Sequence, residues 1–224
     1  MAIDYTKISK TYDTNRWYPQ RLIKEIINFG GFKDGMKILD IECGTGNVAF
    51  QLSELINSYI IGVDISTSML TIAKKKSLEV VCTDVDNIHL PFPNNSFDAM
   101  VGAYVVHQLR NPRFLFSECY RILRKGKLIL LTFSHEQIEH QHPLVKKFFP
   151  TFVHIDKKRF PDIPQIDSLL KSVGFNHIEY KEVLVEDFAI DQEYLDRVKI
   201  STYQPVILCL KKNMILGLKI GNIY

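Results

Sequence analysis

At 224 residues, with 46% hydrophobic and 24% charged residues, the chain has the size and composition of one globular domain with a sizeable core. Its net charge of +3 is mild and gives no argument for a nucleic-acid partner. No segment approaches the roughly 20 apolar residues of a membrane span. The first residues, MAIDYTKISK, have no apolar stretch able to serve as a signal sequence.

The cysteines and histidines bound the chemistry further. Cys43, Cys82, Cys119 and Cys209 form no CxxC pair, so neither a zinc site nor a thioredoxin-like motif is indicated. Three of them lie in apolar or strand-like runs, which favours reduced thiols and a cytoplasmic protein. Four histidines fall within residues 135–164, but without ligand spacing or supporting carboxylates, so we expect no metal site.

Strand-like and helix-like segments alternate over the first two thirds of the chain. Helices are expected at residues 19–29, 46–56, 66–76 and 112–124, and strands at residues 36–41, 59–64, 79–82, 97–105 and 127–133. Ser66 is placed to cap the third of these helices, and Pro112 begins the fourth. The alternation predicts an α/β fold with a doubly wound, mostly parallel sheet of the Rossmann-like type.

The pattern changes after residue 134. Residues 135–164 hold four prolines and many aromatic residues without a clear period, and we interpret them as a substrate-side lid or insertion. Gly174 is expected to stop a short helix at 166–173, and the alternation at 176–185 predicts a half-exposed edge strand. A helix is expected at 191–200, while the apolar tail at 205–224 is ambiguous between helix and strand.

The most informative feature is a glycine turn between two apolar runs. The first run ends in Asp40 and is followed by Gly44 and Gly46, and the second run ends in Asp64. A parallel sheet builds the pocket for an adenosine-containing cofactor in this way. The turn also satisfies the dinucleotide pattern G-x-G-x-x-A, with Asp64 lying 64 − 44 = 20 residues after Gly44.

Three features argue against a dinucleotide. Asp40 would repel a pyrophosphate, whereas it suits S-adenosylmethionine, which carries an ammonium and a sulfonium and no phosphate. Asp84 follows the third strand, where it could accept a hydrogen bond from an adenine amino group. The chain length leaves little room for the separate substrate domain common in dehydrogenases. An NAD(P)-binding oxidoreductase is therefore the less favoured alternative.

Four segments carry a family resemblance. KILDIECGTGN (37–47), GVDIS (62–66), CTDVDNIHLPFPNNSFDAMV (82–101) and NPRFLFSECYRILRKGKLILLTF (111–133) follow in this order. The chain resembles class I S-adenosylmethionine-dependent methyltransferases of the small-molecule, type 11-like family, over roughly residues 12–135. The resemblance implies a seven-stranded sheet with helices on both sides and an antiparallel last strand. It also implies one methyltransferase domain over residues 1–224, with an N-terminal cap or flap at 1–30.

The resemblance further implies S-adenosylmethionine as cofactor, S-adenosylhomocysteine as product and an unidentified small-molecule acceptor, with the protein a monomer or homodimer. The residues implied around the cofactor are Asp40, Gly44 and Gly46 at its methionine part, Asp64 at the ribose hydroxyls, Ile65 and Met69 flanking adenine, Asp84 and the Val85 backbone at the adenine edge, and Gly102 and Ala103 near the methyl group. Cys43 and Arg16 are further candidates for cofactor contact, and His107 is the candidate base. Met69 could equally be a core residue, and His107 could serve only packing.

Two features depart from the family. Glu42 stands where the family normally has glycine or another small residue. It could turn away toward Arg16 or Arg21, contact the cofactor's ammonium group, or block the pocket. The last case would make the chain a degenerate, weakly binding or non-catalytic member. Only residues 205–224 remain for a seventh strand, so an incomplete last strand, with a sheet edge open to another chain, is a second expectation.

Overall fold

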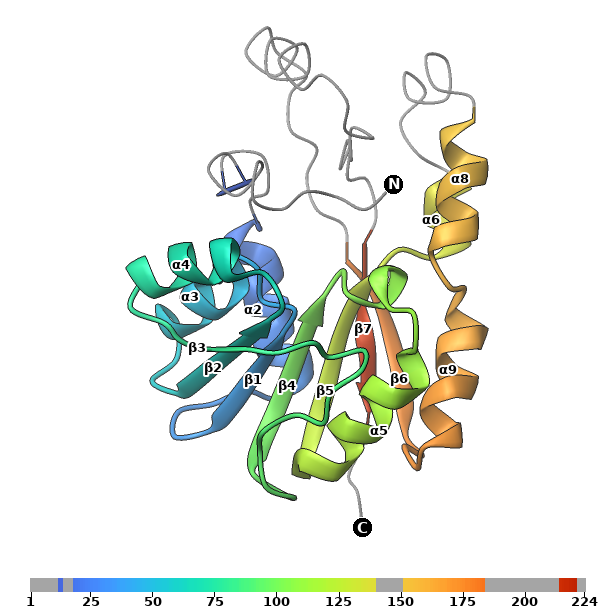
Figure 1. The fold of residues 1–224 in the computed structure, drawn as a ribbon. Helices are drawn as coiled ribbons and strands as arrows, with labels where there is room; N and C mark the ends of the chain where they lie inside the picture. The colour runs from blue at the N-terminus through green and yellow to red at the C-terminus, as the bar shows by residue number, and fades with distance from the viewer. Residues whose placement is uncertain (1–11, 14–17, 140–150, 184–213, 221–224) are drawn as a thin grey trace, which may run out of the picture.

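The computed structural model describes residues 12–13, 18–139, 151–183 and 214–220. The strands within these ranges are β1 (Lys37–Ile41), β2 (Tyr59–Asp64), β3 (Glu79–Cys82), β4 (Phe97–Ala103), β5 (Leu123–Thr132), β6 (Ile178–Val183) and β7 (Met214–Ile220). They form one sheet in the order β3-β2-β1-β4-β5-β7-β6 (Figure 1). β1 to β5 pair in parallel, and β7 runs antiparallel to both β5 and β6. The doubly wound, mostly parallel α/β sheet is confirmed.

Helices cover both faces of this sheet. They are α2 (Gln20–Gly30), α3 (Asn47–Ser53), α4 (Thr67–Lys75), the 3-10 helix η1 (Val106–Gln108), α5 (Pro112–Ile122), α6 (His135–Glu139), α8 (Phe152–Arg159) and α9 (Ile163–Ser172). Side chains of α2 and α3 form one buried cluster, and side chains of α5 and α9 form another. Within the described ranges, no helix has both the length and the apolar character that crossing a membrane requires.

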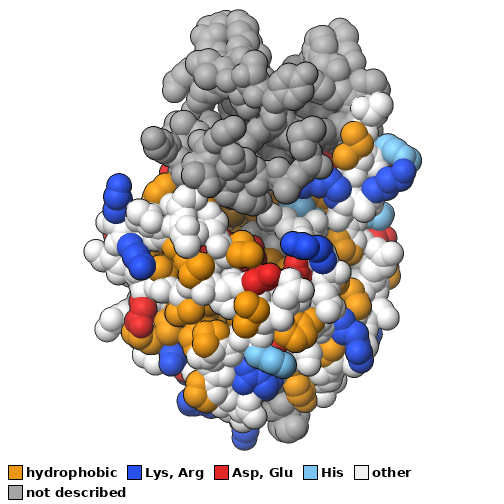
Figure 2. All heavy atoms as spheres, viewed as in Figure 1, with side chains coloured by type: hydrophobic (Ala, Val, Ile, Leu, Met, Phe, Trp, Pro, Cys, Tyr) orange, Lys and Arg blue, Asp and Glu red, His pale blue; other side chains and the backbone are white. Residues whose placement is uncertain are grey.

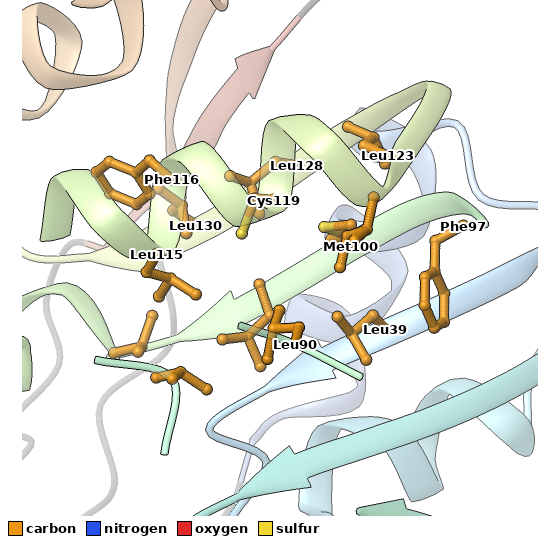
Figure 3. Close-up of a cluster of buried hydrophobic side chains, with 14 of the residues drawn as sticks. Leu39, Leu90, Phe97, Met100, Leu115, Phe116, Cys119, Leu123, Leu128 and Leu130 are labelled. Carbon is orange, nitrogen blue, oxygen red and sulfur yellow. The ribbon is translucent and has the colours of Figure 1, made fainter. Parts of the chain in front are cut away.

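The central strand β4 shows how the sheet joins the two clusters. Met100 belongs to the cluster of α5 and α9, whereas its neighbours Ala99 and Val101 belong to that of α2 and α3. Successive side chains of a strand point to opposite faces, so an apolar run such as this one is buried from both sides. Figure 3 shows Met100 lying between Leu128 and Leu39 within the cluster of α5 and α9.

Local signals account for most helix starts. The Ser66 hydroxyl accepts a hydrogen bond from the Met69 N–H at the start of α4 (3.4 Å), as predicted. Asn111 caps α5, whose first residue is Pro112. Asp162 and Gln165 form a capping box for α9, so this helix begins at Ile163, three residues before the predicted start.

Other boundaries differ from the predictions because backbone conformation or strand pairing overrides the local sequence pattern. β4 ends at Ala103, before the predicted residue 105, because Tyr104 adopts a positive φ of 60°. β5 begins at Leu123, before the predicted residue 127, since Leu123 pairs with Phe97 across an irregularity in the ladder. α6 and α8 fall within residues 135–164, which the sequence left without a period.

The expectation of an incomplete last strand is wrong. β7 supplies the seventh strand and lies between β5 and β6, where Leu216 pairs with both Leu131 and Lys181. β6 is the edge strand, as predicted, although four consecutive residues at its centre are exposed rather than every second one. The helix expected at 191–200 lies outside the described residues.

Candidate functional site

The candidate site lies where β1 leaves the sheet. β1 pairs with β2 on one side and with β4 on the other, and the chain winds outward in opposite directions from this point. Ile41 is level with Val63 of β2 and Gly102 of β4, so the residues that follow these strands meet at one edge. Ligands of open α/β sheets bind at such a switch point, outside the carboxyl ends of the strands.

Backbone hydrogen bonds hold the glycine turn against β2. The Cys43 N–H donates to the Val63 carbonyl (2.9 Å), and the Gly46 N–H donates to the Cys43 carbonyl (2.8 Å). Gly44 and Gly46 have φ of 56° and 76°, a left-handed conformation that glycine adopts without strain. A Cβ on Gly46 would lie 2.2 Å from Leu78 Cδ1, so both the conformation and the space require glycine there.

Asp64 joins this turn to α4. Its Oδ2 accepts the Gly44 N–H (2.8 Å), and its Oδ1 accepts the Ser66 N–H (2.7 Å). Only 6% of Asp64 is exposed. Burial raises the pKa of its carboxyl, and the hydrogen bonds from Ser66 and Gly44 oppose that rise. Each carboxylate oxygen can accept a second donor, so Asp64 can hold the turn and still bind hydroxyls.

Asp40 lies behind the turn. It is 1% exposed, and its Oδ2 accepts the Ala49 N–H of α3 (3.1 Å). Burial raises the pKa of Asp40 to about 8, the Ala49 hydrogen bond lowers it, and the charge of Asp64 adds to the rise. Asp40 therefore fixes α3 to β1.

Glu42 sits in this site with an unusual backbone. Its φ is 54°, and its side chain is half-buried. Burial raises the pKa of Glu42 to about 8, with further contributions from the charges of Asp64, Asp86 and Asp84. No hydrogen bond or ion pair connects Glu42 to Arg21 in the part of the chain that the structure describes. The alternative in which Glu42 turns toward Arg21 is therefore wrong; Arg16 lies outside the described residues.

The loop after β3 brings two more acids to the same edge. Asp84 accepts hydrogen bonds from the Asp86 N–H (3.0 Å) and from the Asn87 side-chain amide (2.8 Å). Asp86 accepts the backbone N–H groups of Arg110 and Asn111, each at 3.1 Å. Asp86 thereby ties this loop to the start of α5, a role that sequence reasoning missed because neither backbone donor has a sequence signature.

The other residues expected near adenine divide into exposed and buried ones. Ile65 is 52% exposed, so its side chain is free to contact a ligand. Met69 and Val85 are almost fully buried, and Val85 packs in the cluster of α5 and α9. Cys43 is half-buried, and burial among Asp40, Asp64 and Glu42 raises the pKa of its thiol, which disfavours the reactive thiolate.

Two residues of the N-terminal segment lie against the turn. Asp13 accepts a hydrogen bond from the Thr45 hydroxyl and forms an ion pair with Lys76 (2.7 Å). The Lys76 ammonium also donates to the Asn47 side chain (2.6 Å). A Tyr12 ring carbon lies 3.9 Å from the place of a Cβ on Gly44. Neither Asp13 nor Lys76 belongs to a recognisable motif, so the sequence did not reveal this network.

Beyond β4 the site changes character. Gly102 is buried, and a Cβ there would lie 2.9 Å from Val105 Cγ1. Ala103 is half-buried and ends the strand. The next residue, Tyr104, stacks on Tyr18, with ring centroids 6.2 Å apart. At the end of β4 the backbone is therefore closely packed, and the chain then turns toward a group of aromatic rings.

These rings form what we call the aromatic row, which comprises Tyr18, Tyr104, Phe133, Phe160 and His107. Tyr104 and Phe133 lie 5.2 Å apart, and Phe133 and Phe160 lie 5.7 Å apart. His107 stacks on Phe160 at 4.1 Å with an interplanar angle of 16°. The row supports a packing role for His107 and also keeps its half-buried ring in one orientation beside the carboxyl end of β4.

Comparison with known proteins agrees with this geometry. Residues 39–131 match the family model described as a methyltransferase domain. This stretch contains the glycine turn, Asp64, the acids after β3 and the end of β4. Over residues 39–131 the chain is therefore similar to methyltransferase domains, in agreement with the resemblance to class I S-adenosylmethionine-dependent methyltransferases described above.

Relatives of this chain differ in length and in the substrates that their names give. Phosphoethanolamine N-methyltransferase 2 of Caenorhabditis elegans is 27% identical over 177 residues, which are 74% of this chain and 40% of the relative. Demethylmenaquinone methyltransferase of Lactococcus lactis is 27% identical over 173 residues, which are 66% of this chain and 69% of the relative. The chain thus spans less than half the length of the first of these proteins.

A solved structure supports the fold. Phosphoethanolamine N-methyltransferase 2 of Haemonchus contortus, bound to phosphomonomethylethanolamine and S-adenosylhomocysteine, superposes with a TM-score of 0.66. The alignment is 18% identical and covers 97% of this chain and 57% of the Haemonchus chain. At this identity the likeness shows a shared fold. The acids and the aromatic row are features of this chain's own site.

Near the middle of the face in Figure 2, acidic side chains lie among hydrophobic ones, with a basic side chain beside them.

Proposed function

We propose that this protein binds S-adenosylmethionine at the carboxyl ends of β1, β2 and β3 and transfers its methyl group to a small-molecule acceptor on the side of the aromatic row. The observation that carries the proposal is the acidity of the glycine turn. Asp40 and Asp64 are buried beside it, and within the described ranges no ion pair links either one to a cation. Such a turn favours a cofactor with positive charge and hydroxyl groups over one with a pyrophosphate.

The chain's own residues have distinct roles in this proposal. Asp64 accepts hydrogen bonds from the ribose hydroxyls while it holds the Gly44 N–H. Asp84, half-buried, accepts from the adenine amino group, and the exposed Ile65 side chain covers one face of the base. Met69 is 1% exposed, which favours a supporting role beneath the cofactor rather than direct contact.

The protein contributes chiefly placement to the reaction. When bound, S-adenosylmethionine supplies a methyl group activated by its sulfonium. Gly102 and Ala103 leave room at the end of β4 for an acceptor to approach in line, and holding the two reactants together replaces an unfavourable encounter. His107 can take a proton where the acceptor must lose one, since stacking on Phe160 fixes its ring beside the end of β4.

The aromatic row favours an acceptor with an apolar or flat part, or a cationic amine held over a ring face. The names of the two sequence relatives, an amine and a quinone methyltransferase, include both kinds. Tyr12 and Asp13 against the turn support an N-terminal flap within residues 1–30, and α6 and α8 support a substrate-side lid within residues 135–164. We propose that the protein is a monomer or homodimer, that it has no nucleic-acid partner and that it acts in the cytoplasm.

A non-catalytic member of the family is the second candidate, because Glu42 adds bulk and charge at a position that glycine suits. Calorimetric titration with S-adenosylmethionine and S-adenosylhomocysteine, with NAD and NADP as controls, separates the candidates. Binding of the two adenosyl compounds alone supports the proposal. Binding without turnover of any amine or phenol acceptor would favour the second candidate, and binding of NAD alone would overturn both.

A further inference from the structure

We propose that Glu42 makes this site discriminate by charge, so that it binds S-adenosylmethionine, with its cationic sulfonium, in preference to S-adenosylhomocysteine, with its neutral thioether. The inference rests on the cofactor site proposed above. Its consequence is a product that leaves more readily than the substrate cofactor, because transfer of the methyl group removes the charge that the site attracts.

The position of Glu42 is fixed by its neighbours. Ile41 is the last residue of β1 and is level with Val63 and Gly102. The two residues after Glu42 are anchored to β2 through the Cys43 N–H to Val63 and the Gly44 N–H to Asp64. Glu42 is therefore held at the switch point itself, between the ends of β2 and β4, where the family places its cofactor.

The charges around Glu42 are one-sided. Its electrostatic neighbours are Asp64, Asp86 and Asp84, in that order of effect. None of these four carboxylates forms an ion pair with a cation among the residues that the structure describes. Lys76, which lies at the same turn, is paired with Asp13 instead. The site thus holds like charges close together, an arrangement that a bound cation relieves.

The raised pKa values agree with the clustering of like charges around Glu42, but the inference rests on the positions of these residues. Asp40, Glu42 and Asp64 all have carboxyl pKa values above their ordinary range, with burial as the first cause in each case. A neutral group on a ligand does not offset the cost of burying these carboxylates close together. A sulfonium does, and the substrate and product cofactors otherwise present the same groups to the protein, so the difference in their affinities isolates the effect of charge.

The test compares the dissociation constants of both cofactors in the full chain and three variants. Glu42→Gln keeps the side-chain size and removes the charge. Glu42→Gly removes the side chain and the positive-φ strain. Glu54→Gln is the matched control, because Glu54 is exposed at the end of α3 and is not among the charges that act on Glu42. Titrations above the pKa of about 8 of Glu42, compared with titrations well below it, change the fraction of the carboxylate that is charged, and any charge-based preference should grow with pH.

We expect the ratio of the S-adenosylhomocysteine to the S-adenosylmethionine dissociation constant to fall about fivefold to tenfold in Glu42→Gln and Glu42→Gly. Glu54→Gln should leave it unchanged. Sinefungin, which has a protonated amine in place of the sulfonium, should lose affinity together with S-adenosylmethionine.

An unchanged ratio in Glu42→Gln would overturn the inference and leave the cofactor site intact. Equal tightening of all three ligands in Glu42→Gly would also overturn it, since Glu42 would then be only an obstruction. If no variant, Glu42→Gly included, bound any adenosyl compound, the proposed function itself would fail and the inference with it.

Discussion

The two halves of the carboxyl edge are held together by different forces. On the β1–β2 side, carboxylates accept backbone N–H groups: Asp64 from Gly44 and Ser66, and Asp40 from Ala49. On the β4–β5 side, stacked rings replace the hydrogen bonds. Hydrogen bonds to a charged acceptor fix atoms within narrow limits of distance and angle, whereas ring contacts tolerate sliding and exchange.

This difference suits the proposed reaction, in which a cofactor held in one place meets a separately bound acceptor. The hydrogen-bonded half joins residues 9 and 20 positions apart in the sequence. The aromatic row collects residues from the segment before α2, the turn after β4, η1, and the positions directly after β5 and α8. If the two halves are independent, a substitution in one should leave the function of the other unchanged.

The largest expected effect is in the aromatic row. Phe160 is 6% exposed and contacts both His107 and Phe133. Phe160→Ala should lower the free energy of unfolding by about 3 kcal/mol, because it removes a buried ring and leaves a cavity. Urea unfolding measures this loss, and calorimetry should find the S-adenosylmethionine affinity within about twofold of the parent.

Phe50→Ala is the matched control for that substitution. Phe50 lies on α3 and is 37% exposed, so its removal should cost less than about 1 kcal/mol. A tenfold loss of cofactor affinity in Phe160→Ala would show that the two halves are coupled.

The glycine turn should be the next most sensitive. Gly46→Ala combines a φ of 76° with a Cβ 2.2 Å from Leu78 Cδ1. We expect a loss of about 2 kcal/mol in unfolding free energy, since the conformation costs about 1 kcal/mol and Leu78 must shift. Gly35→Ala separates the two costs, because Gly35 has a φ of 78° and open space around its Cβ position. Equal losses in both variants would contradict the role assigned to Leu78.

Asp64→Asn tests recognition rather than packing. The amide keeps one acceptor oxygen but turns an N–H₂ group toward a backbone donor, so the Gly44 or the Ser66 bond is lost. We expect about tenfold weaker S-adenosylmethionine binding by calorimetry, with a loss of about 1 kcal/mol in stability. Asp34→Asn is the control, because Asp34 also accepts a backbone N–H, that of Asn57 (2.8 Å), but lies exposed near the start of β1. A similar loss of binding in that variant would remove the assignment of Asp64.

The same comparison explains what could be predicted from the sequence. The turn half was legible because its determinants are local: glycines at fixed spacing, an acid at each strand end and Ser66 at a helix start. Asp13 escaped notice because it reaches the turn from a distant segment and belongs to no motif. In Glu42 the sequence showed the departure from glycine and placed Asp64 and Asp84 at the same pocket, but it gave no sign that Asp86 would also act on Glu42.

The acceptor half depends on contacts that no local pattern contains. His107 was legible as a position after a strand, yet its partner Phe160 comes from a segment without a clear period. β7 was ambiguous for the same reason, since it pairs with Leu131 and Thr132 far earlier in the chain. Non-local pairing decides both, and local propensity is too weak to stand in for it.

The smallest effect expected concerns pH and stability on the turn side. The pKa of Glu42 is raised from 4.5 to about 8. Between these values the native protein binds a proton that the unfolded chain has lost, so the free energy of unfolding should fall as pH rises from about 5 to about 8. Glu42→Gln should flatten part of this slope, and Asp40, whose pKa is also raised to about 8, should keep the rest of it.

Glu118 gives the opposite sign and serves as the control. Hydrogen bonds from Arg121 lower its pKa to about 2, with His89 and the Leu90 N–H contributing further. Its contribution to stability is therefore complete above about pH 4.5 and is lost as pH falls toward 2. Glu118→Gln should change the pH slope of a urea-unfolding series only in this acid limb, and Glu42→Gln should change it only between pH 5 and 8. A Glu42→Gln profile parallel to the parent's would mean that Glu42 is already charged in the free protein, and the charges around it would then have to be offset by a cation at the turn.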